Sequence, residues 1–179
     1  MLQEPRAPAP LAPRHTALAL PPYRFIPGIN KHPVRDPQGH SFGREEIKLS
    51  FQDPKEWKQN VAYLFGVDLY NNAFWWEAHE AWEAVWHTTD KDSAYGQFLQ
   101  GLIQIAAAFI KWHSHEGIGM TKLYALGIMR LEFTAKKFPD FMGLDLKMHL
   151  EKLKNHFAEV LKGGTWPDAI AGYPFILLG

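Results

Sequence analysis

The stretch from Leu99 to Phe109 is apolar on almost every side of a helix, and only Gln100 and Gln104 interrupt it. A helix that is hydrophobic all round has to be enclosed by other elements. The run is far shorter than the roughly 18 residues that a membrane span requires, so it predicts a buried core helix. We therefore expect a helix at about residues 93–113 to form the centre of a helical bundle.

Helical periodicity continues on both sides of this central segment. Asp53 followed by Pro54 predicts the start of a helix that runs to about residue 70. Asn71 and Asn72 favour a left-handed turn into the next helix. The sequence shows no strand pattern, so the predicted fold class is all-α, an up-and-down helical bundle of about five helices. Besides the central helix, these are expected at residues 53–70, 73–88, 118–138 and 145–162.

The two ends of the chain predict irregular structure. Residues 1–20 are rich in proline and alanine and predict a disordered tail. Nine of the 13 prolines precede residue 40, so residues 21–43 predict an extended arm whose aromatic and aliphatic side chains hold it against the domain. Residues 44–179 form the predicted helical domain, and its last part predicts an irregular but packed C-terminal strap. His32 and His40 of the arm either reach a cleft or are ordinary surface histidines.

The composition excludes several functional classes. The 179 residues carry 19 basic and 19 acidic side chains, so no basic field favours nucleic acid or an anionic membrane. The chain has no cysteine, which excludes disulfides and thiolate metal sites and fits a reducing compartment. The N-terminus lacks the pattern of a signal peptide. We expect a cytoplasmic protein with no membrane segment, and the many aromatic residues are compatible with a homodimer formed through an apolar patch.

The polar residues that most need an explanation lie among four of the seven tryptophans, in the predicted helix at residues 73–88. His79 and Glu83 are one helical turn apart and can point at the same metal ion. An imidazole and carboxylates fit zinc, iron or manganese. Such a site needs a further ligand, for which the candidates are His113 and His115 or the two histidines of the arm. Without a metal, the same pair can form a hydrogen-bonded link inside the bundle.

The other glutamates and the two glutamines allow similar alternatives. Glu80, inside the His-Glu-x-x-Glu motif, is the candidate general base, or else a solvated charge. Glu77 is expected to be a solvated charge, or else, like Trp86, a residue that binds a ligand or supports the metal ligands. Gln100 and Gln104 need hydrogen-bond partners on an otherwise apolar helix. The simplest arrangement places them against His79 and Glu83, as groups that orient the ligands.

The segment from Phe74 to Trp86, with its Ala-His-Glu-x-x-Glu-x-x-Trp pattern, and the Gln-Gly-Leu-x-Gln pattern that begins at Gln100 resemble domain-of-unknown-function family 309 over roughly residues 54–138. The resemblance implies a small up-and-down helical fold and the label of predicted metal-dependent hydrolase. The positions that correspond to the family's pattern are Glu77, His79, Glu80, Glu83, Trp86, Gln100 and Gln104.

Two functions follow as expectations. In a metal-dependent hydrolase, His79 and Glu83 bind a divalent metal such as zinc, Glu80 deprotonates water, and Gln100 or Gln104 orients the substrate. In a non-catalytic helical binding or scaffold module, the same residues are structural and an exposed groove meets a protein or small-molecule partner. Convergence of a third ligand on a partly open pair favours the enzyme, whereas full burial of the pair favours the module.

Overall fold

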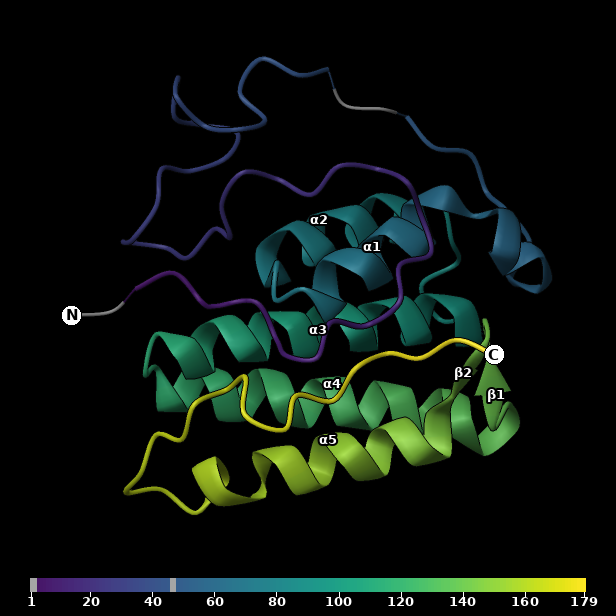
Figure 1. Ribbon diagram of the computed structural model, residues 1–179. Coiled ribbons are helices and arrows are strands. Elements are labelled where there is room, and N and C mark those ends of the chain that lie inside the picture. The colour runs from purple at the N-terminus through teal and green to yellow at the C-terminus, as the bar shows by residue number, and fades with distance from the viewer. Residues whose placement is uncertain (1–2, 46–47) are drawn as a thin grey trace.

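The computed structural model describes residues 3–45 and 48–179. This part of the chain contains a 3-10 helix, five α-helices and one two-stranded hairpin (Figure 1). The elements are η1 (Pro54–Gln59), α1 (Val61–Asn71), α2 (Trp75–Trp86), α3 (Ala94–His113), α4 (Gly117–Lys137), β1 (Asp140–Phe141), β2 (Leu144–Asp145) and α5 (Leu146–Leu161). Each α-helix packs on the next one in the chain, so the predicted up-and-down helical bundle is confirmed.

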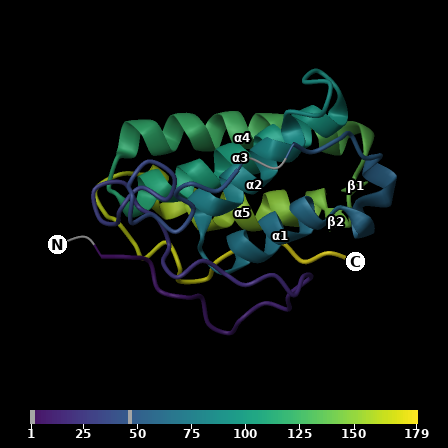
Figure 2. The same cartoon turned by 90° about the horizontal axis from the view of Figure 1, so that it is seen from above.

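The apolar helix α3 lies between α2 and α4, as its composition requires. Phe98, Leu99, Ala106, Ala108 and Phe109 of this helix are fully buried. The helix starts at Ser93, whose side chain accepts a hydrogen bond from the Gly96 backbone N–H. Figure 2 shows the helices from above, with the N-terminal segment running along one side of the bundle.

Three local details differ from the sequence prediction. The first predicted helix is divided at Asn60, because this side chain caps α1 through the Tyr63 N–H and also donates to the Tyr95 hydroxyl. The left-handed residue before α2 is Ala73, with φ of 61°, rather than either asparagine. The structure also contains a short antiparallel hairpin of β1 and β2, for which the sequence shows no strand pattern.

The N-terminal segment also differs from the prediction of a disordered tail for residues 1–20. Residues 1 and 2 lie outside the described residues. From residue 3 onward the segment runs along the helices (Figure 1). Asp68 of α1 is fully buried and accepts hydrogen bonds from the backbone N–H groups of His15 and Thr16 and from the Thr16 hydroxyl. A buried carboxylate needs such donors, and the nearby tail supplies them.

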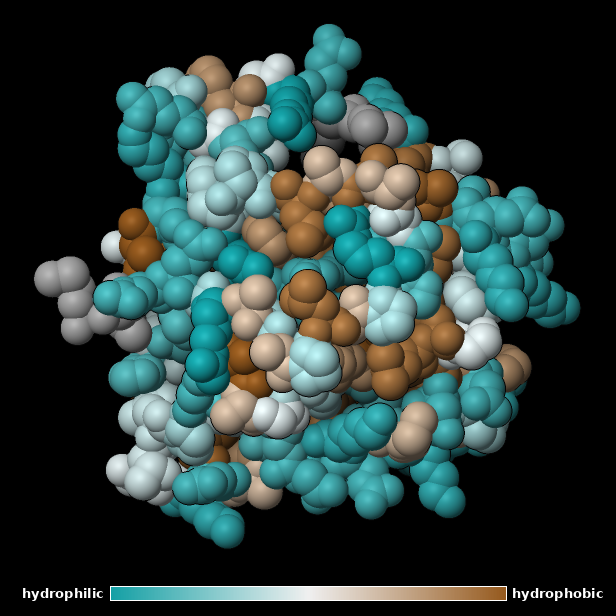
Figure 3. Space-filling view, viewed as in Figure 1, coloured by the Kyte–Doolittle hydropathy of each residue, from teal (hydrophilic) through white to brown (hydrophobic). Residues whose placement is uncertain are grey.

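The C-terminal strap connects α1 and α2 to the rest of the bundle. The Asn71 side chain exchanges two hydrogen bonds of 2.8 Å with the backbone of Ile176. Tyr173 accepts a hydrogen bond from the Trp75 indole and donates one to the Tyr70 carbonyl. In the space-filling view, apolar side chains gather in the middle of the face that the strap crosses, inside a hydrophilic border (Figure 3). Among the described residues, no helix combines the length and hydrophobicity of a membrane span.

The position of α2 depends on a close approach to α1. Trp82 is fully buried, and its indole N–H donates to the Tyr63 carbonyl at 3.2 Å. A Cβ at Gly66 would overlap the same indole. Trp82 therefore fits only because residue 66 has no side chain.

We predict that Gly66→Ala destabilises the fold by about 2 kcal/mol, because the indole has to move out of a close-packed core. Gly119→Ala is the matched control, since its Cβ would make only ordinary contacts, at 3.4 Å or more, with the flexible Lys111 side chain. Urea unfolding of the two variants measures the difference. Equal stabilities would contradict the packing described for Trp82.

His149 of α5 is a buried histidine with no hydrogen-bond partner on either ring nitrogen among the described residues. Burial lowers the pKa of His149 from 6.5 to about 4, and the nearby Lys152 charge acts in the same direction. The folded state thus holds this imidazole neutral while the unfolded state protonates it. The stability of the fold must fall as the pH drops from about 6.5 towards 4.

We predict that His149 accounts for about 3 kcal/mol of this loss in the wild type and that His149→Leu removes this part, while His156, whose pKa burial also lowers, keeps a smaller part. The measurement is the free energy of unfolding at pH 7.5 and pH 4.5. His87→Gln, at an exposed histidine, should keep the pH dependence of the wild type. A His149→Leu variant with unchanged pH dependence would show that another group is responsible.

Candidate metal centre

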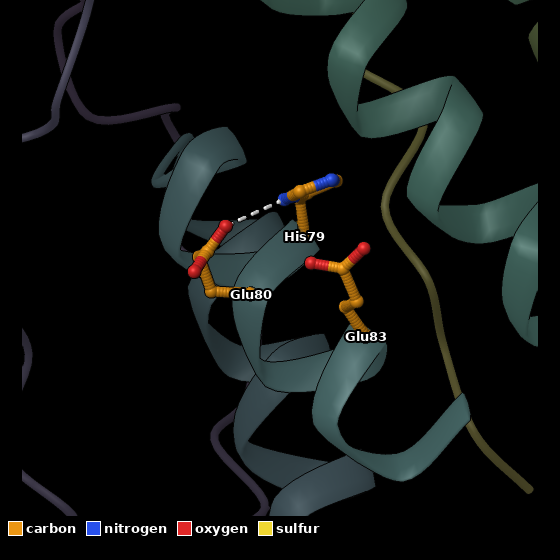
Figure 4. A group of neighbouring side chains, drawn as sticks. All are labelled: His79, Glu80 and Glu83. Carbon is orange, nitrogen blue, oxygen red and sulfur yellow. Dashed lines mark hydrogen bonds and ion pairs between the residues drawn. The ribbon is translucent and has the colours of Figure 1, made fainter. Parts of the chain in front are cut away.

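A single helix carries the three candidate ligands. Because α2 is unbroken from Trp75 to Trp86, His79 and Glu83 lie one turn apart, with Glu80 beside them (Figure 4). One ligand atom from each of the three side chains lies within 4.8 Å of the other two. Among the described residues, this is the only such group of three or more histidine and acidic side chains. The spacing in the sequence is therefore sufficient to assemble the cluster.

Glu80 is the third group of the cluster, and it bonds directly to the histidine. Its Oε1 lies 3.1 Å from His79 Nδ1. With the proton on Nδ1, the imidazole donates to Glu80 and leaves the Nε2 lone pair free for a ligand. A carboxylate that orients a histidine in this way is the usual partner of a metal-binding imidazole. Figure 4 shows Glu80 and Glu83 approaching His79 from two sides.

The cluster is partly open to solvent. The side chains of His79 and Glu80 are 26% and 43% exposed, and Glu83 is half-buried. Full burial, the arrangement expected of a purely structural pair, is therefore not observed. Trp82, which the sequence places near this face, is instead completely buried in the core.

The expected hydrogen bonds from α3 are not formed. Among residues 3–45 and 48–179, the side chains of Gln100 and Gln104 make no hydrogen bond to His79 or Glu83. Gln104 is 8% exposed and its Oε1 is buried without a partner, while Gln100 is half-buried. The two glutamines lie on α3, which packs against α2. No observed contact supports their predicted role in orienting the ligands.

Trp86 contacts the loop after α2 rather than the cluster. The Lys91 ammonium lies 3.8 Å from the centre of the Trp86 ring and donates to the Trp86 carbonyl. The indole N–H is buried without a partner in the described part of the chain. Near the start of α3, Gln97 accepts a hydrogen bond of 2.6 Å from Arg130 of α4. Arg130 could not be found from the sequence, because nothing local connects it to Gln97.

None of the other histidines proposed as ligands belongs to the cluster. His113 Nε2 bonds to the Gln3 carbonyl, and His115 stacks on Trp166. In the arm, His32 packs against Trp76 and His40 pairs with Glu77. The expectation of a further ligand from these four residues was wrong, since each has a different partner.

Glu77 was expected to be solvated, and this was wrong as well. The residue is only 6% exposed. Its Oε1 accepts hydrogen bonds from the Phe25 backbone N–H at 3.0 Å and from His40 Nε2 at 3.1 Å. Its position in the first turn of α2 places the negative charge at the favourable end of the helix dipole. Glu77 thus fastens the arm to the helix that carries the cluster.

The donor set of the cluster fits a divalent metal ion. One imidazole nitrogen and carboxylate oxygens suit zinc, iron and manganese, whereas calcium and magnesium prefer oxygen alone. His79 Nε2 and Glu83 could supply two ligands from adjacent turns. With ligands from one helix only, the remaining coordination positions would be left to Glu80, water or a substrate.

The part of the chain that carries this cluster is related to a known family. Residues 63–123 match the model of a family described as Domain of unknown function (DUF309). This segment is a DUF309 domain. The domain runs from α1 into α4 and includes the cluster, Gln100 and Gln104. The arm and α5 lie outside the DUF309 match, which is shorter than the resemblance seen in the sequence. No curated protein and no solved structure matches the chain.

Proposed function

We propose that this protein is a metal-dependent hydrolase whose metal ligands are His79 Nε2 and the Glu83 carboxylate. The observation that supports the proposal is the partly exposed cluster of His79, Glu80 and Glu83 on one face of α2. A bound divalent ion would act as a Lewis acid and make a coordinated water acidic near neutral pH. The open side of the cluster would leave room for that water and for a substrate.

The roles of the protein groups follow from their contacts. Glu80 Oε1 holds the Nδ1 proton of His79 and so fixes the tautomer that presents Nε2 outward. The exposed position of Glu80 leaves its second oxygen accessible to solvent. Because Nδ1 and Nε2 lie on opposite edges of the imidazole ring, Glu80 in this position would orient the histidine. It would have to leave Nδ1 to act as the general base predicted from the sequence.

A second candidate function is a non-catalytic binding module. The observation that favours it is the outer side of α4, where Ile118, Met129 and Phe133 are 92%, 54% and 52% exposed. Large exposed side chains on one helix favour contact with a partner. The two functions separate experimentally, because the module requires no metal.

For the metal proposal, we predict near-stoichiometric zinc or manganese after incubation with the ion and removal of the excess, measured by mass spectrometry of the full chain. His79→Ala should lose the bound metal. Glu80→Gln should weaken the affinity by roughly 10- to 100-fold, because the orienting carboxylate is lost.

His87→Ala is the matched control, since His87 lies at the C-terminal end of the same helix and outside the cluster. It should bind metal like the wild type. A wild-type protein without metal, or a His79→Ala variant with unchanged metal content, would contradict the proposal and leave the binding module as the better account.

A further inference from the structure

A cavity of about 480 Å³ lies between the N-terminal arm and the α1–α2 hairpin. Leu20, Phe65 and Trp76 contribute to its apolar wall, and His40 and Glu77 lie at its polar end. The volume is within the usual range for sites that bind small molecules. His79 and Glu83 do not line the cavity, so the cavity adjoins the candidate metal centre only through Glu80.

The polar end of the cavity has an unfilled hydrogen-bonding requirement. Glu77 uses Oε1 for two hydrogen bonds, but its Oε2 is buried and has no partner among the described residues. An ionised carboxylate accepts up to about four hydrogen bonds, and burying part of it unpaired is costly. Glu77 is therefore a residue of the cavity wall that lacks, within the described part of the chain, a hydrogen-bond donor for one of its two oxygens.

The donors nearest to Glu77, on His40 and Arg24, already have hydrogen-bond partners. His40 directs Nε2 to Glu77 Oε1, and its Nδ1 lies 2.9 Å from the Ser41 hydroxyl, so the ring is held from both sides. The Arg24 guanidinium bonds to the Asn72 carbonyl and pairs with Glu4, and its charge also attracts that of Glu77. The arm has no regular secondary structure where it borders the cavity, and Oε2 is covered in this structure, so a ligand has to displace part of this wall to reach it.

We propose that this cavity binds a small organic cation, a primary ammonium group attached to an apolar body. The ammonium would donate to Glu77 Oε2 and neutralise its charge, and the apolar body would lie against Phe65 and Trp76. Glu80 also lines the cavity and adds a second negative charge. An anionic ligand would meet repulsion from both carboxylates. Arg44, the cation that lines the cavity, is exposed to solvent, which screens its charge.

The test is calorimetric titration of the full chain with 2-phenylethylammonium, beside the neutral 2-phenylethanol and the anionic phenylacetate. We expect the ammonium compound to bind at least tenfold more tightly than the alcohol and phenylacetate not to bind. Glu77→Gln should weaken ammonium binding at least tenfold. Glu132→Gln, at an exposed carboxylate outside the cavity, should leave it unchanged.

Glu77→Gln could also release the arm, and faster hydrogen exchange at the Phe25 amide would reveal this. A second variant tests the cavity without changing Glu77. Ala81→Leu fills the cavity from α2 and leaves Glu77 and its bonds to the arm in place. It should abolish binding of 2-phenylethylammonium. Equal affinities for the ammonium and the alcohol, or binding that survives Ala81→Leu, would overturn the proposal.

Discussion

The enclosure of α3 is the constraint on which the rest of the structure depends. This helix can be stable only when other elements cover it, and α2 and α4 do so from two sides. The packing of α2 on α3 determines which face of α2 is buried. Ala78, Trp82 and Val85 are buried, and His79 and Glu83 are consequently left on the part of the helix that solvent still reaches. The candidate metal centre is thus a consequence of how the core is closed.

The helix α2 also serves a second site. Glu77 in its first turn holds the arm, and the arm in turn encloses the cavity beside α1. Glu80 belongs to both environments, because it bonds to His79 and also lines the cavity. Two turns of helix therefore carry three carboxylates with different partners. Glu77 pairs with a backbone amide and a histidine, Glu80 pairs with an imidazole, and Glu83 has only the cluster itself. The arrangement explains why so many charges can be tolerated among so many indoles.

The parts of the fold that could be predicted are those that depend on local spacing. The helices follow from periodicity, and the approach of His79 and Glu83 follows from their separation by one turn. The break at Asn60 includes a local contact, the cap on the Tyr63 N–H, for which asparagine is suited, whereas the bond of Asn60 to Tyr95, 35 residues away, could not be predicted. The burial of Glu77 could not be predicted either, since its donors are an arm backbone amide and His40. Contacts of this kind leave no pattern in the sequence.

The most direct test of the central claim, that α2 carries a metal centre, is anomalous diffraction from crystals of the full chain grown with zinc. Our account predicts an anomalous peak about 2.0–2.2 Å from both His79 Nε2 and a Glu83 carboxylate oxygen. Glu80 should remain bonded to Nδ1 of the same ring. Anomalous peaks found only at other histidines, with Glu83 free of metal, would contradict the account.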